Sequence, residues 1–122
     1  MGSNPINLAV RFFLELAALY AFGYWGWTQY EGGMRFALAI GLPLIAAALW
    51  GTFAVPNDPS RSGKAPVPVS GIIRLVLELA FFAIATWLLF DAGQLLWAKT
   101  LGVSTLIHYL ISYDRITWLL KQ

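Results

Sequence analysis

The sequence predicts an all-α membrane protein whose four transmembrane helices form an up-and-down bundle from two parallel helix-hairpin repeats. Composition is the first indication, because 59% of the 122 residues are hydrophobic, only 11% are charged, and the mean hydropathy is +0.68. Soluble domains are usually about one quarter charged, and a chain this short buries only part of its surface. Lipid is therefore expected to surround much of the apolar surface. The other two indications are four long apolar segments and a motif that occurs twice.

The first segment runs from about Ile6 to Trp27 and begins with two helix-start signals. Asn4 is a candidate N-cap, and Pro5 takes the first helical position, where a missing N–H costs nothing. About 20 residues rising about 1.5 Å each cross a hydrocarbon core of about 30 Å. The segment closes with an expected interfacial belt of aromatic residues: Tyr24, Trp25, Trp27 and Tyr30.

The second segment runs from about Met34 to Val55. Pro43 lies inside it, and we expect a kink there, since neighbouring helices can satisfy the freed backbone groups. Trp50 and Phe53 are expected to mark the far interface, and Pro56 to end the helix. Residues 56–69 are rich in proline and polar side chains, which predicts an exposed, mobile linker in the cytoplasm.

The third segment runs from about Ser70 to Phe90, with Ser70 as its expected N-cap. The fourth runs from about Gly93 to Tyr113, and a helical tail is expected to extend it through Trp118 and Leu120. Asp91 and Gln94 have the spacing of a capping box at its start. We therefore predict one membrane domain, 1–122, with repeat one at 6–55 and repeat two at 70–120.

The repeat is visible in a motif of seven residues. Arg11 to Ala17, RFFLELA, recurs as Arg74 to Ala80, RLVLELA, at an offset of 63. Gly32 and Gly41 of the first repeat match Gly93 and Gly102 of the second at an offset of 61. The change of offset fits a turn in the first repeat that is two residues longer than the turn in the second. Two hairpins in tandem run in the same direction, so a pseudo-twofold axis along the membrane normal is expected.

The basic residues predict the orientation. Six lie on the side of the termini and the linker, namely Arg11, Arg61, Lys64, Arg74, Arg115 and Lys121, and two lie opposite, Arg35 and Lys99. Positively charged loops stay in the cytoplasm. We therefore expect the N-terminus, the C-terminus and the linker to be cytoplasmic.

The candidate functional residues are the two arginine–glutamate pairs. Glu15 and Glu78 each lie one helical turn beyond an arginine, in sequence that otherwise belongs in lipid, where ionisable groups are costly and often functional. Arginine before glutamate is the less favourable order for the helix dipole, which suggests partners on other helices. Facing repeats would pair Arg11 with Glu78 and Arg74 with Glu15. Such a crossed ring is either structural, fixing the helix register, or a proton or cation site on the two carboxylates.

His108 is the third candidate, because it is expected at about the same depth as the glutamates. An imidazole near carboxylates can relay protons. The structural alternative is a histidine hydrogen-bonded within the bundle, with Ser104 or Thr105 as partners. The aromatic residues near the segment ends fit membrane anchors, and the alternative for them is an aromatic-lined cavity for a hydrophobic cation.

Several classes of function are not supported. The chain lacks cysteine and has one histidine, which excludes thiol chemistry and multi-histidine metal sites within one protomer. We find no phosphate-binding loop or nucleophile motif, and we expect no cofactor, no metal and no enzyme activity. A net charge of +2 does not suggest nucleic acid as a partner. The expected partners are the lipid bilayer and either a second copy of the chain or another membrane protein.

Four motifs together resemble the YrdB-like family of small bacterial membrane proteins: the two RxxxELA stretches, GYWG at residues 23–26 and LWGTF at residues 49–53. The resemblance covers nearly the whole chain and implies four helices and a bacterial cytoplasmic membrane, with no assigned activity. Glu15 also looks similar to the helix-one glutamate of small multidrug-resistance transporters. Those proteins lack both the preceding arginine and the second copy of the pair, so this likeness is an analogy.

The leading interpretation is a non-enzymatic membrane protein that is structural or accessory to a membrane partner. The alternative is a small transporter or channel for protons or cationic compounds, in which Glu15 and Glu78 are coupling groups and His108 is a relay.

Overall fold

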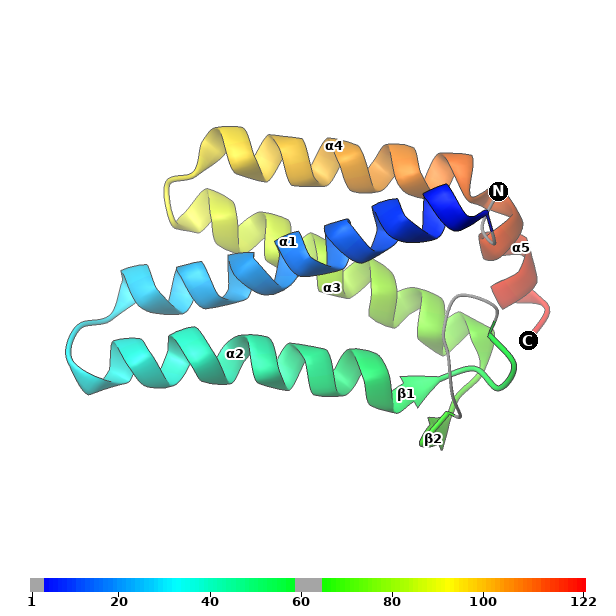
Figure 1. Cartoon of the computed structure of the whole chain (residues 1–122), viewed down its shortest axis with the longest axis horizontal. Coiled ribbons are helices and arrows are strands. Elements are labelled where there is room, and N and C mark those ends of the chain that lie inside the picture. The colour runs from blue at the N-terminus through cyan, green and yellow to red at the C-terminus, as the bar shows by residue number, and fades with distance from the viewer. Residues whose placement is uncertain (1–3, 59–64) are drawn as a thin grey trace.

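The computed structural model describes residues 4–58 and 65–122, and these residues form an all-α fold (Figure 1). Its helices and two short strands follow in the order α1 Pro5–Gln29, α2 Gly33–Thr52, β1 Phe53–Ala54, β2 Val67–Pro68, α3 Gly71–Asp91, α4 Leu95–Ile111 and α5 Tyr113–Leu120. The all-α prediction is confirmed, and the last predicted segment is divided into α4 and α5.

The four long helices lie side by side, with α1 crossing α3 at the centre, α2 flanking α1 and α4 flanking α3 (Figure 1). Small residues allow the central helices to approach closely, because Ala18, Ala21, Ala85 and Ala98 are all fully buried. The N-terminal end of α1, the C-terminal helix α5 and the segment after α2 gather at one end of the molecule (Figure 1). This end holds the candidate site.

Large apolar side chains cover the outside of the bundle. Phe13, Leu96 and Leu110 are between 65% and 74% exposed, as expected of side chains that contact lipid. Helices α1, α2 and α3 are long and apolar enough to cross a membrane, and α4 is an apolar helix of 17 residues. Length and composition thus support membrane crossing for three helices, whereas α4 is shorter.

The two predicted N-caps of α1 and α3 are present, and the predicted capping box of α4 is not. Asn4 accepts a hydrogen bond from the backbone N–H of Ile6 at 2.9 Å, and Ser70 accepts one from Ile73 at 3.3 Å. Gln94 makes no capping bond with its side chain. Instead it donates to the Tyr24 hydroxyl at 2.9 Å, while Asp91 accepts from the Trp25 indole at 2.8 Å. Both polar side chains therefore tie the α3–α4 turn to α1.

The end of the second segment and the linker differ from the prediction. Helix α2 continues through Pro43 but ends at Thr52, and β1 then pairs in parallel with β2. The expected linker is not exposed throughout, because Asp58 is only 5% exposed. Arg61 and Lys64 lie outside the described residues.

Helix α5 packs across the start of α3 at a position that only glycine permits. A Cβ atom on Gly71 would lie 1.6 Å from the backbone oxygen of Leu119, a distance at which the chain must move. Leu119 is fully buried in this contact. The close approach brings Arg115 of α5 into the interior, where it is 5% exposed.

Candidate functional site

The candidate site is a buried charge cluster centred on Glu78. The carboxylate is fully buried, and its Oε2 atom lies 2.8 Å from Arg11 Nη2 and 2.9 Å from Arg74 Nε. Arg115 donates to both carboxylate oxygens, and the Tyr109 hydroxyl donates to Oε1 at 2.8 Å. Side chains from α1, α3, α4 and α5 therefore meet on one carboxylate.

Arg74 also links the cluster to the end of α2. Its Nη1 group donates to the backbone oxygens of Trp50 and Phe53, which are among the carbonyls that the end of a helix leaves without intrahelical partners. The guanidinium carbon of Arg74 lies 4.5 Å from the centre of the Trp50 ring, and that of Arg11 lies 5.2 Å from it. Trp50 was predicted as an interfacial anchor, but here it is a half-buried cation–π partner of two arginines.

Arg115 extends the cluster to the linker. Its Nη1 and Nη2 groups donate to the two carboxylate oxygens of Asp58 at 2.7 and 3.0 Å, a bidentate arrangement that only arginine provides. Burial by itself lowers the pKa of Arg115, but the hydrogen bonds and charges of Asp58 and Glu78 outweigh burial and hold that pKa above its ordinary value. Asp58 and Glu78 therefore favour the charged form of Arg115.

Side chains of opposite charge pair throughout the described part of the cluster. Three arginines, Arg11, Arg74 and Arg115, meet three carboxylates, Glu15, Asp58 and Glu78. A buried charge is tolerated when it is paired and its remaining hydrogen-bonding groups are satisfied. Pairing of opposite charges explains how these six ionisable side chains can occupy one end of an apolar bundle.

Glu15 is placed differently from its repeat counterpart. Its only ion pair in the described chain is with Arg11, at 3.4 Å between Oε1 and Nε, and its side chain is 22% exposed. Of the two crossed contacts that were expected, the structure contains Arg11 with Glu78. Arg74 bonds instead to Glu78 on its own helix, because the end of α2 supplies the carbonyl oxygens that orient its guanidinium. The two carboxylates are therefore not equivalent.

His108 borders the cluster without bonding to it. The residue is 4% exposed, and its ring packs edge-on against Tyr109. Within the described residues its Nδ1 atom has no hydrogen-bond partner, and the same holds for Thr105 Oγ1 and Arg11 Nη1. Of the two partners suggested for His108, the Thr105 hydroxyl is therefore not bonded to it in the described chain.

The sequence-based prediction identified Arg11, Arg74 and Glu78 but missed Asp58, Tyr109 and Arg115. From the sequence, Arg115 is predicted only to lie with other basic residues on the side of the termini and the linker. The sequence offered only the spacing of Arg115 and Leu119, one helical turn apart, and the structure shows that both are buried in α5. Nothing near Asp58 distinguishes it from a linker aspartate. No group of three or more metal-ligating side chains occurs in the part of the chain that the structure describes.

The fold and the site define a small all-α protein with apolar helices of membrane-spanning type, joined at one end by a cluster of buried, paired charges. The chain belongs to the family described as "Protein of unknown function (DUF2568)", whose model matches residues 9–106. It is 41% identical over 123 residues to the "Uncharacterized protein YrdB" of Bacillus subtilis (strain 168), covering 98% of this chain and 97% of that protein. No solved structure matches it. The resemblance to the YrdB-like family is thus confirmed.

Proposed function

We propose that the protein is a non-enzymatic component of the bacterial cytoplasmic membrane, structural or accessory to a membrane partner, in which the charge cluster has an architectural role. The observation that carries this proposal is the environment of Glu78. It is fully buried and accepts hydrogen bonds or ion pairs from three arginines and one tyrosine. Interactions of this number hold a carboxylate in its ionised form.

A carboxylate held by four donors is better suited to an architectural role than to the exchange of protons or cations. To exchange a proton or a cation, Glu78 would have to leave three guanidinium groups that are themselves buried, at a cost of several kcal/mol. The same contacts join α1, α3, α4, α5 and the segment after α2 at one end of the bundle. The cluster therefore fixes how the two hairpins and the C-terminal helix sit together.

The proposal includes a topology. The basic residues support a cytoplasmic position for both termini and the linker, with all four long helices crossing the membrane. Helix α4 is the shortest of the four, and at about 1.5 Å per residue its 17 residues extend about 25 Å. It would cross the membrane where the bilayer is locally thinner, or together with the residues that flank it at each end. The repeated motif supports an origin of the two hairpins from one unit.

Proton release and uptake on titration of the purified protein in detergent tests the proposal. Wild type is compared with Glu15→Gln and Glu78→Gln. We expect no carboxylate titrating near neutral pH, and a loss of thermal stability that is larger for Glu78→Gln. A group that titrates near neutral pH and disappears with one substitution contradicts the architectural role.

The second candidate is a transporter or channel for protons or cations, now centred on Glu15 rather than on both glutamates. The observation in its favour is that Glu15 is 22% exposed and has one ion pair, at 3.4 Å. The Glu15→Gln arm of the titration separates the two candidates. Loss of a near-neutral titration in this variant supports the transport function, and an unchanged titration supports the architectural one.

A further inference from the structure

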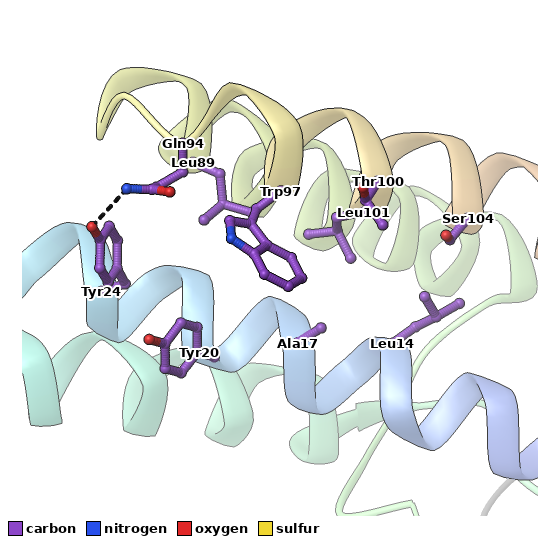
Figure 2. A pocket seen from close by; sticks show the side chains of 10 residues that line it. All are labelled: Leu14, Ala17, Tyr20, Tyr24, Leu89, Gln94, Trp97, Thr100, Leu101 and Ser104. Atoms are coloured by element: carbon purple, nitrogen blue, oxygen red, sulfur yellow. Dashed lines mark hydrogen bonds between the residues drawn. The ribbon is translucent and has the colours of Figure 1, made fainter.

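A cavity of about 480 Å³ opens in the groove between α1 and α4, away from the charge cluster (Figure 2). The side chains around it are aromatic, aliphatic and polar but uncharged: Leu14, Ala17, Tyr20, Tyr24, Leu89, Gln94, Trp97, Thr100, Leu101 and Ser104. Leu89 comes from α3 and the others from α1 and from α4 with the turn before it. We call this space the α1/α4 groove. Its volume lies within the range of about 300–1,000 Å³ that is typical of small-molecule sites.

Polar groups are distributed along the whole length of the groove. At one end the Gln94 side chain donates to the Tyr24 hydroxyl at 2.9 Å, and Trp97 extends from α4 toward α1 in the middle (Figure 2). The Thr100 hydroxyl donates to the Leu96 carbonyl, which leaves its oxygen able to accept. Within residues 4–58 and 65–122, the Tyr20 hydroxyl and the Ser104 hydroxyl make no hydrogen bond. In lipid, such groups have no water to bond with.

The opposite side of the bundle provides an internal comparison. The groove between α2 and α3 contains a smaller cavity, of about 190 Å³, whose lining is apolar except for the edge of Trp50. Leu77 and Ala80 of α3 line it, and they occupy the repeat positions of Leu14 and Ala17. One side of each groove is thus formed by residues at equivalent positions of the repeated motif. The two grooves differ in that the α1/α4 groove has the larger cavity and is lined by hydroxyl groups.

We propose that the α1/α4 groove binds an uncharged, lipid-soluble molecule that carries a ring and oxygen hydrogen-bonding groups. Tyr20 and Trp97 supply flat aromatic faces for a ring, and Thr100 and Ser104 supply hydroxyls for its oxygens. No Asp, Glu, Lys or Arg lines the groove, so a charged ligand would lose its hydration without gaining a partner. A plain acyl chain fills the space but leaves the hydroxyls without partners. This site is separate from the charge cluster and does not depend on the function proposed for it.

The test uses decylubiquinone, a short-chain benzoquinone, as the probe. The full-length protein is reconstituted in phosphatidylcholine vesicles, and quenching of tryptophan fluorescence is measured as the probe is added. We expect a saturable component that Trp97→Phe largely removes. Ala17→Phe places a ring in the groove and should weaken the apparent affinity about tenfold or more, which corresponds to about 1.4 kcal/mol or more.

Ala80→Phe is the matched control, because it makes the same change at the equivalent position of the opposite groove. We expect it to leave the affinity unchanged. A second probe, decanol, has the chain without the ring, and should not displace the quinone. The proposal is overturned if quenching is non-saturable, if both phenylalanine variants respond alike, or if decanol competes as well as the quinone does. The melting temperature of each variant establishes that it is folded.

Discussion

Replacing Glu78 by glutamine is the most informative perturbation of the charge cluster. The substitution keeps the shape of the side chain but removes the charge that faces Arg11, Arg74 and Arg115. All three guanidinium groups then lose the one buried carboxylate that they share, so their positive charges repel one another with less compensation. The glutamine oxygen still accepts one or two of the hydrogen bonds, and the loss is therefore mainly electrostatic.

The expected cost is about 3–5 kcal/mol in the free energy of unfolding, the range found when one partner of a buried ion pair is removed. Glu15→Gln is the matched control in the other repeat. Its side chain is 22% exposed and its ion pair is 3.4 Å long, so we expect a cost below about 1 kcal/mol. The repeat thus offers the same substitution at two depths of burial.

Unfolding of both variants is measured by titrating sodium dodecyl sulfate into mixed micelles while following circular dichroism. A double variant tests the electrostatic reason, since Glu78→Gln with Arg74→Gln leaves Arg11 beside Glu15 and Arg115 beside Asp58. We expect the double variant to be more stable than the sum of the single changes implies, by about 0.5–3 kcal/mol. Equal costs for the two glutamine variants, or strict additivity in the double variant, would refute the reasoning.

Three further predictions concern the surroundings of the cluster. Gly71→Ala should displace α5 and reduce the melting temperature sharply, because the added Cβ has no space. Gly41→Ala, in open space within α2, is the control and should be neutral or stabilising. The sensitivity of α5 to trypsin gives a second measurement of the displacement. Asp58→Asn should cost about 1–3 kcal/mol, since a buried charged hydrogen-bond pair is weakened, and a cost near zero in the same micelle titration would show that the linker contact is dispensable. Tyr109→Phe should cost about 1 kcal/mol or more in the free energy of unfolding, because it removes a hydrogen bond to a buried carboxylate. The neighbouring His108→Leu should be neutral or stabilising, because the Nδ1 atom of His108 has no partner in the described chain. A larger loss of stability for His108→Leu than for Tyr109→Phe would show that His108 has a polar partner.

The class of fold and most of the helices could be predicted from the amino-acid sequence. An apolar composition with few charges predicts apolar helices of membrane-spanning type, and the start of α1 and of α3 followed from Asn4 and Ser70, whose side chains act within their own turn. The arginine–glutamate motif likewise predicted that Arg11, Arg74 and Glu78 belong together, because ionisable groups on apolar helices need partners. Local chemistry was sufficient for each of these conclusions.

Which carboxylate lies at the centre of the cluster depends on tertiary contacts. The two RxxxELA motifs are nearly identical in sequence, but α5 folds back over Gly71 and brings Arg115 to Glu78, whereas no described element brings a second guanidinium within ion-pair distance of Glu15. The role of Asp58 could not be predicted for the same reason, because its partner Arg115 lies 57 residues later in the sequence. Long-range contacts give the two copies of the motif different surroundings, and residues within one helical turn do not specify such contacts.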